Sequence, residues 1–477
     1  MSTRPLPPRI TVREVRLSER EVRLRMPFRF GVVTLTESPQ IFARVRVALE
    51  DGREAWGMAA EMLAAKWFDK NTALRNEENF AQLRTSVRTC AQGYVADRTP
   101  RTPFGLFAGH YADHVAACAA QSLNPLIAGY GPALLDRAVM DAVCRIANVS
   151  FFDAMRANLA GMAPGEVAPD LAGFDIDKFL RGLTPLVSVH ARHTVGLVDP
   201  ITAGDQTPGT RVKDGLPETL EEVVAEYGHT YFKIKVGGDL RADVARLTAI
   251  ACVLDRADAD YHVTLDGNEQ YRSVDAVMEL WSALERTPKL RRLVASTLFI
   301  EQPLARAVAL DADVRPLCAR RPVIIDESDG TIDSFVAARA RGYRGVSSKS
   351  CKGFYKSIIN AARCARWNAQ AGAPTFFMSA EDLTTQAGVS LQQDLALVAL
   401  LGLQHVERNG HHYVNGMSAL PGAEQNAFLK AHPDLYARSD GAVRLRILEG
   451  RIALGSLAYP GFAVGAEPDW AAMQPLA

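Results

Sequence analysis

The chain has 477 residues, which is enough for two or three domains with sizeable hydrophobic cores. Because 54 basic residues balance 54 acidic ones, its formal net charge is zero, and we expect it to bind neither nucleic acid nor an anionic membrane. The sequence has no uninterrupted apolar run of about 18 residues, so we expect no membrane span. We also expect no signal peptide, because the N-terminus lacks the apolar core of one.

The start of the chain predicts a small antiparallel sheet. Residues 10–25 and 41–50 alternate apolar and polar side chains, and Asp51-Gly52 is a typical hairpin turn. Between the two runs lies the aromatic and basic turn Phe28-Arg29-Phe30, and a second loop follows at residues 56–61. On the pattern alone, these loops are most simply surface turns with aromatic side chains packed beneath them.

The next segment, residues 72–160, predicts a group of helices. Helical spacing of apolar residues covers 74–90, 112–123 and 133–147, with breaks at 100–105 and 124–125. Residues 185–190 then predict the first strand of a second domain.

Five short apolar runs in the second half of the chain each end in a charged residue. Their ends lie roughly 23 to 35 residues apart, about one strand, loop and helix per step, and the intervening segments show helical periodicity. This pattern predicts a (β/α) barrel of the TIM type, whose chemistry lies at the C-terminal strand ends. The charged residues at or near these ends are Lys233 and Lys235, Asp266, Glu301, Asp326, and Lys349.

The end of the chain changes pattern again. Residues 374–381 predict a later barrel strand and 391–401 a helix, whereas alternation over 443–454 predicts strands that rejoin the N-terminal sheet. We therefore expect an α/β protein with three segments: an α+β capping domain at 1–184, the barrel at 185–440, and a C-terminal return to the cap at 441–477.

Three carboxylates, Asp266, Glu301 and Asp326, would repel one another at one barrel mouth unless a cation neutralised them. Oxygen-only ligands favour a hard divalent ion, and Mg²⁺ suits best. The alternative is that each carboxylate merely caps the helix that follows its strand.

The lysines suggest acid–base chemistry beside this site. Lys233 and Lys235 are two residues apart on a strand, so they share a face, and their crowding lowers the pKa of one, as a general base requires. Lys349 would stand across the barrel, with Lys352 as a rival for its role. A divalent cation between opposed lysines suits abstraction of the proton next to a carboxylate, because the metal stabilises the enediolate that forms. Taken alone, a strand-end lysine is more simply a solvated charge.

In this order and at this spacing, Lys233-Ile-Lys235, Asp266-Gly-Asn268, Glu301-Gln-Pro303, Asp326-Glu-Ser328 and Lys349 resemble the enolase superfamily. They are most similar to its muconate-lactonising and dipeptide-epimerase subgroup within the mandelate racemase/muconate lactonising enzyme family. The Asp51-Gly52 hairpin resembles that family's cap, and Gly441 to Phe462 its C-terminal return.

The resemblance implies a role for each residue. Asp266, Glu301 and Asp326 would hold Mg²⁺, while Lys235 and Lys349 would be the opposed acid/bases, with Lys233 lowering the pKa of Lys235. The turn Phe28-Arg29-Phe30 and the loop at 58–66 would close over the mouth and set specificity. Further candidate substrate contacts are Asn268, Lys352 and Glu381.

Departures from the family pattern keep the reaction open. The His-Asp pair of the racemase and sugar-acid-dehydratase subgroups is not evident, and the late histidines His405, His411 and His412 are expected at the surface or beside the substrate. Lys349 is followed by Ser350-Cys351-Lys352-Gly353 without a double glycine. The expected activity is racemisation, epimerisation, cycloisomerisation or elimination on a small carboxylate. The alternatives are an acid-sugar dehydratase, a silent barrel that binds a partner, and a Schiff-base aldolase.

Seven cysteines, an odd number without zinc-finger spacing, favour free thiols in a reducing compartment. We therefore expect a cytoplasmic protein, and the family resemblance implies a homo-oligomer.

Overall fold

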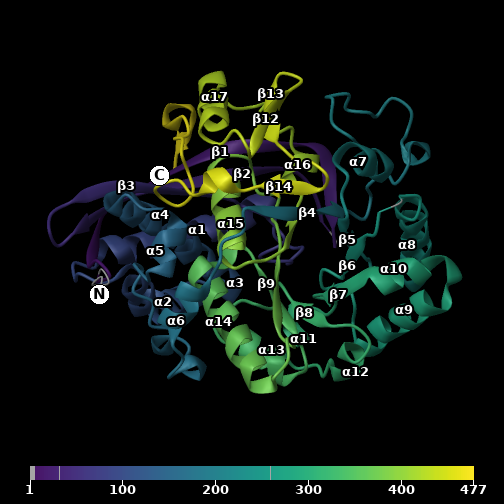
Figure 1. Ribbon diagram of the computed structural model, residues 1–477, viewed down its shortest axis with the longest axis horizontal. Coiled ribbons are helices and arrows are strands. Elements are labelled where there is room, and N and C mark those ends of the chain that lie inside the picture. Colours follow the sequence, from purple (N-terminus) through teal and green to yellow (C-terminus); the bar gives the residue numbers. More distant parts are fainter. Residues whose placement is uncertain (1–5, 32, 258, 477) are drawn as a thin grey trace.

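A computed structural model describes residues 6–31, 33–257 and 259–476. In Figure 1 a purple sheet and blue helices form a cap on one side, and a teal-to-green barrel forms the other. The cap sheet is a meander of β1 (Ile10–Phe30), β2 (Val33–Leu49) and β3 (Glu54–Met62). The predicted hairpin at Asp51-Gly52 is confirmed, since Gly52 takes a positive φ of 88° between β2 and β3.

Helices cover one face of this sheet. The chief ones are α1 (Asn76–Ala96), α2 (Pro103–Ala119) and α4 (Tyr130–Ala147), and α4 packs against β2, β3 and α1. The helix α2 begins inside the predicted break, because Thr102 caps it by accepting from the Gly105 N–H, and a proline is well suited to the first helical position. The shorter helices are α3 (Pro125–Ala128), α5 (Phe151–Arg156) and α6 (Ile176–Gly182).

The second half of the chain forms a closed barrel of eight parallel strands, because the last strand pairs with the first. The predicted TIM-type barrel with an α+β cap is therefore confirmed. The first strand starts at Ser188, later than the predicted 185–190. In order, the strands are β4 (Ser188–Val195), β5 (Tyr231–Lys235), β6 (His262–Asp266), β7 (Thr297–Glu301), β8 (Val323–Ile325), β9 (Gly345–Ser348), β10 (Phe377–Ala380) and β11 (His405–Arg408).

Helices surround the barrel and bury its outer face. Apolar residues of α8 and α9, such as Leu247 and Trp281, meet strand residues such as Val263 in one core, which holds the strand ends in place. The helices are α7 (Leu220–Tyr227), α8 (Leu240–Leu254), α9 (Val274–Arg286), α10 (Arg291–Ser296), α11 (Arg306–Ala309), α12 (Arg315–Cys318), α13 (Ser334–Ala340), α14 (Phe354–Ala371), α15 (Val389–Leu400) and α16 (Gly410–Tyr413).

The C-terminal segment differs from the prediction. After α17 (Gly422–Ala431), β12 (Tyr436–Ser439) and β13 (Ala442–Leu445) pair with each other, and β14 (Arg451–Ala453) pairs antiparallel with β4 of the barrel. The alternating residues 443–454 therefore find their partners outside the N-terminal sheet. The return to the cap is made by β15 (Gln474–Pro475), which pairs with β1.

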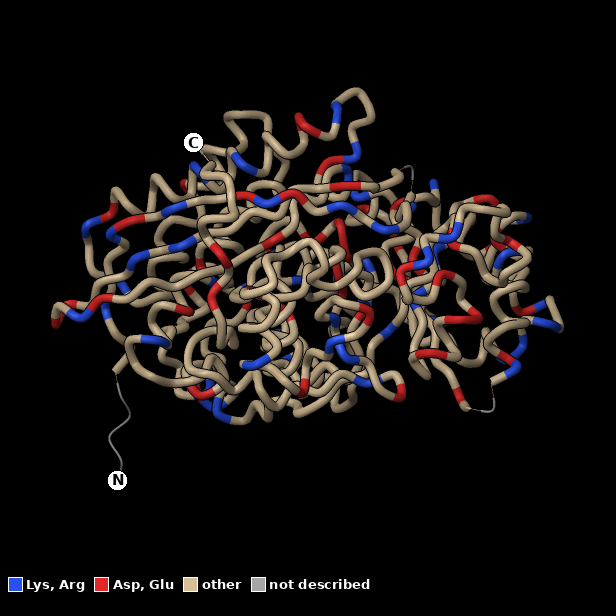
Figure 2. The backbone as a smooth tube through the Cα atoms, turned by 90° about the horizontal axis from the view of Figure 1, so that it is seen from above, with Lys and Arg blue, Asp and Glu red and all other residues tan. Residues whose placement is uncertain are grey.

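Figure 2 shows basic and acidic residues interspersed along the described residues, and neither sign dominates, in keeping with the zero net charge. Among the described residues, no helix is both long and apolar enough to span a bilayer.

Candidate active site at the barrel mouth

The parallel register brings the predicted charged residues together. Lys235 pairs with Asp266 across β5 and β6, and Asp266 pairs with Glu301 across β6 and β7. Asp326 directly follows β8, and Lys349 directly follows β9. Each of these side chains is buried, although all are ionisable. Buried charges are costly unless they are paired, so their partners decide what the site can do.

Lys233 lies at the centre of the buried carboxylates. Its Nζ lies 2.8 Å from Glu301, 2.7 Å from Glu381, and 3.0 Å from Asp266 and Glu407. Burial alone would lower the pKa of Lys233, but these four carboxylates hold it well above its usual value. Lys233 is therefore a fixed positive charge that holds the carboxylates together.

The other lysines pair with the outer two carboxylates. Lys235 Nζ lies 2.5 Å from Asp266 Oδ2, and Lys349 Nζ lies 2.7 Å from Asp326 Oδ2. Burial would raise the pKa of both carboxyls, but the neighbouring ammonium groups hold it below the usual value. In turn, Asp326 raises the pKa of Lys349 despite its burial.

Glu301 is the exception among the three predicted metal ligands. Its Oε2 is buried and has no hydrogen-bond partner among the described residues. Burial, then the negative charges of Asp266 and Glu381, raise its pKa well above the usual value. A hard divalent cation would satisfy this oxygen and reduce the repulsion, so the donor set fits Mg²⁺. Among the described residues, these three carboxylates do not form a group whose ligand atoms all lie within 4.8 Å of one another, and each of them contacts a lysine.

A cavity of about 20 Å³ lies between the barrel mouth and the cap. Lys235 and Lys349 both line it, and they come from the second and sixth of eight barrel strands, so they face each other across the barrel. Asn268 also lines it. From the cap come the aromatic rings of Phe28 and Phe30.

The remaining predicted contacts lie elsewhere. The Arg29 side chain is exposed to solvent. Glu381 is buried against Arg192 and Lys233. Lys352 donates to Ser347 Oγ at 2.7 Å and lies beside a separate cavity with Lys356. Of the two rival lysines, Lys349 is therefore the one that faces the cavity.

Two charged residues of the site were missed in the sequence. Glu407, near the end of β11, accepts from Lys233 and from Thr194, and lines the cavity. The sequence held a signal for Glu407. Like the other charged strand ends, it comes after an apolar residue, Val406, and this segment follows the helix predicted at 391–401. Arg192, in β4, pairs with Glu381, but it lay beyond the strand predicted at 185–190.

Charged side chains join the cap to the barrel at the barrel mouth. Lys70 Nζ donates to the Asn268 carbonyl at 2.6 Å, and the Arg306 guanidinium donates to the carbonyls of Trp67 and Phe68 at 2.8 Å. The Trp67 ring in turn covers Lys349, with Nζ 4.2 Å from the ring centre. Trp67, Phe68 and Lys70 belong to the cap loop, the segment 63–75 between β3 and α1. The cap loop therefore covers Lys349, the lysine that faces the cavity.

Comparison with known protein families gives one match for this chain. Residues 215–424 match the family described as "Enolase C-terminal domain-like". A search of curated proteins found no match.

Solved structures share the whole fold at low sequence identity. An enolase from Bradyrhizobium, complexed with magnesium and mandelic acid, is 16% identical with a TM-score of 0.59, covering 99% of this chain and 98% of that one. A dipeptide epimerase from Enterococcus faecalis, complexed with Mg and L-Leu-L-Tyr, is 14% identical with a TM-score of 0.57, covering 93% and 99%. A muconate lactonizing enzyme from Pseudomonas fluorescens, complexed with muconolactone, is 16% identical with a TM-score of 0.59, covering 97% and 98%. The chain thus shares its fold with each of these three proteins.

Proposed function

We propose that this protein abstracts the α-proton of a small carboxylate in a Mg²⁺-dependent reaction, a proposal supported by the family match over residues 215–424. The observation that carries the proposal is that Lys235 and Lys349 face each other across one cavity, above buried carboxylates. Two bases on opposite faces of a substrate carbon support racemisation or epimerisation. One base alone suffices for cycloisomerisation or elimination through the same enediolate.

The residues take separate roles. Lys235 and Lys349 would remove and deliver the proton, and Lys349 is preferred to Lys352 because it lines the same cavity as Lys235. Lys233 is a positioning residue, because its ammonium group is occupied by four carboxylates. Glu407 lies on the cavity wall, and its negative charge is held by Lys233.

Asp266, Glu301 and Asp326 are the residues that would hold Mg²⁺. The ion would supply charge stabilisation for the two oxygens of the enediolate. The unpartnered, buried oxygen of Glu301 supports this assignment.

The cap favours a substrate with an apolar part. The cavity is lined on the cap side by Phe28, Phe30, Leu35 and Trp67. A lining of this kind suits the side chain of an amino-acid derivative or an aromatic acid better than the hydroxyls of a sugar acid. The cavity holds about one water molecule, so substrate entry requires the cap loop to move.

The test is α-proton exchange followed by NMR in D₂O. The protein, with and without Mg²⁺, meets pools of dipeptides, N-acylated amino acids, aromatic hydroxy acids and sugar acids. We expect Mg²⁺-dependent deuterium uptake that Lys235→Ala or Lys349→Ala abolishes or makes one-sided in stereochemistry, while Lys352→Ala retains it. Absence of both exchange and Mg²⁺ binding would rule out the metal site and favour a silent barrel.

A further inference from the structure

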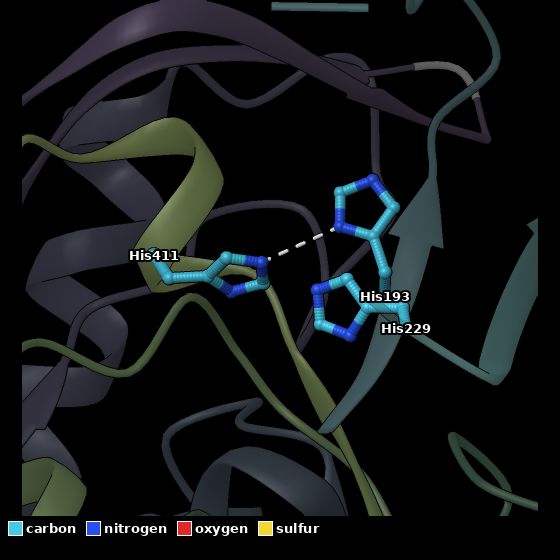
Figure 3. A group of neighbouring side chains, drawn as sticks. All are labelled: His193, His229 and His411. Atoms are coloured by element: carbon cyan, nitrogen blue, oxygen red, sulfur yellow. Dashed lines mark hydrogen bonds between the residues drawn. The ribbon is translucent and has the colours of Figure 1, made fainter. Parts of the chain in front are cut away.

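Three buried histidines meet on the outer side of the barrel wall. His193 lies in β4, His229 lies just before β5, and His411 lies in α16 (Figure 3). Their exposed fractions are 1%, 4% and 8%. Because side chains alternate along a strand, His193 points away from the interior that its neighbour Arg192 enters. The cluster is therefore separate from the charged barrel mouth.

Ring nitrogens of the three histidines converge, and two ring nitrogens in the cluster lack a hydrogen-bond partner among the described residues. His193 Nδ1 lies 3.4 Å from His411 Nε2, as the dashed line in Figure 3 marks. One nitrogen from each of the three rings lies within 4.8 Å of the other two. His229 Nε2 and His411 Nδ1 are buried without a hydrogen-bond partner among the described residues.

The second nitrogen of His229 is held as in a metal ligand. His229 Nδ1 lies 3.0 Å from the Ala191 carbonyl, which can only accept, so Nδ1 carries the proton. Nε2 therefore bears a free lone pair directed into a buried space. Metal-ligating histidines commonly donate their other N–H to a backbone carbonyl in this way.

The cluster is neutral at physiological pH. Burial lowers the pKa of His229 to about 4, and burial together with the neighbouring rings lowers the pKa of His193 and His411 well below the usual value. The charged group that acts on His411 is Arg408. Each neutral ring keeps one proton and has one nitrogen with a free lone pair.

We propose that His193, His229 and His411 bind one borderline divalent metal ion, such as Zn²⁺, with a further position open to water. Three imidazoles form a known zinc ligand set, and tetrahedral Zn–N bonds place neighbouring nitrogens about 3.3 Å apart, close to the separation of His193 and His411. Imidazole ligands do not suit Mg²⁺, so this site is chemically distinct from the carboxylate site.

A route for the ion leads to this cluster. His411 and Tyr227 line a cavity of about 130 Å³ between α7, α16 and the β12–β13 hairpin. The lining carries both signs of charge, Glu226 and Asp440 against Arg408 and Arg444, and Arg444 pairs with Asp440 at 3.0 Å. A bound ion would join β4 to its two neighbours, because His411 follows β11 and His229 precedes β5. It would thus fasten the barrel where its first and last strands close.

The test is Zn²⁺ titration by calorimetry on chelator-treated protein in excess Mg²⁺, with the unfolding temperature followed in parallel. We expect one site per chain and an unfolding temperature that Zn²⁺ raises. His229→Gln and His411→Asn should each weaken binding about 100-fold or more and remove the Zn²⁺-induced rise. Asp266→Asn and His110→Gln should retain both, because His110 lies in α2 and contacts Asp97 instead.

If these variants do not fold, the metal site can still be tested on the wild-type protein. Electron paramagnetic resonance of protein loaded with one equivalent of Cu²⁺ should show coupling to imidazole nitrogens. A spectrum with oxygen ligands alone, or Zn²⁺ binding that is absent or equal in wild type and both histidine variants, would overturn the proposal. The three residues would then be packed neutral histidines.

Discussion

Two adjacent residues of β4 lead into two different buried polar clusters. Arg192 points into the barrel, where ammonium and guanidinium groups meet five carboxylates. His193 points outward to rings that stay neutral. Both clusters are almost fully buried, so burial alone does not decide how a polar group is accommodated.

The difference lies in how each cluster meets the cost of desolvation. Charged groups in the barrel are stable only as a matched set, so each depends strongly on its partners. The histidines stay neutral instead, and two of their ring nitrogens are left without a hydrogen-bond partner among the described residues. The inner cluster, made of the charged residues around Lys233, is therefore suited to moving protons. The outer cluster, made of His193, His229 and His411, is suited to binding a metal.

The most severe way to break the inner cluster is Lys233→Met. It leaves Glu301, Glu381 and Glu407 without their shared cation, and removing one partner of a buried ion pair typically costs about 3–5 kcal/mol. We expect a loss of that order in denaturant unfolding at pH 7. Lys352→Met is the matched control, since Lys352 contacts fewer carboxylates. An equal or smaller effect at Lys233 would contradict its central role.

Lys349→Ala separates function from stability in the same cluster. Loss of a general base typically costs 10²- to 10⁴-fold in rate, so we expect exchange in D₂O to fall by about that factor. Asp326 still contacts Lys352, at 3.4 Å, so the protein should remain folded. Partial rescue by added alkylamines would support the role of Lys349 as a base. Full activity in the variant would transfer the role to another group.

The two clusters also differ in how well the sequence predicts them. The charged strand ends of the inner cluster repeat at barrel spacing, so Lys235, Asp266 and Lys349 could be placed in advance. The outer cluster gives no such signal, because none of its members ends an apolar run: His193 lies inside β4, His229 precedes β5, and His411 lies in α16. The histidine His411, expected at the surface or beside the substrate, is instead buried outside the barrel.

The C-terminal strands show a second limit of the sequence. Alternation over 443–454 correctly predicted extended chain, but periodicity does not specify which edge a strand joins. The pairing of β4 with β5 begins only at Arg192, so the start of β4 at Ser188–His190 takes β14, while β12 takes β13.

Acid should weaken the outer cluster before the inner one. His229 has a folded pKa of about 4, below its unfolded value, so its contribution to stability is present above about pH 6.5 and is lost as the pH falls towards 4. Asp266 and Asp326 have lowered pKa values, so their contributions are lost only below about pH 4. Between pH 7 and 5, unfolding free energy should fall by about 1–2 kcal/mol for this histidine.

His229→Gln should flatten this pH dependence, whereas His110→Gln should leave it unchanged. A profile that stays flat in wild type between pH 7 and 5 would contradict the neutral state of the buried histidines. Saturating Zn²⁺ should shift the loss to lower pH, because protons then compete with the metal.

The smallest effect is expected where the inner cluster meets the cap. Arg306 joins Glu269 to the carbonyls of Trp67 and Phe68, and only a planar guanidinium can reach all three acceptors. Arg306→Lys keeps the charge but loosens the loop that carries Trp67 over Lys349. We expect substrate KM to rise about 10-fold, the cost of one hydrogen bond to a charged group, with kcat changed less. Arg315→Lys, an exposed control paired with Asp313, should change neither. A large fall in kcat with unchanged KM would instead mean that the loop positions Lys349 for the proton transfer itself, so the variant tells whether the cap serves binding or chemistry.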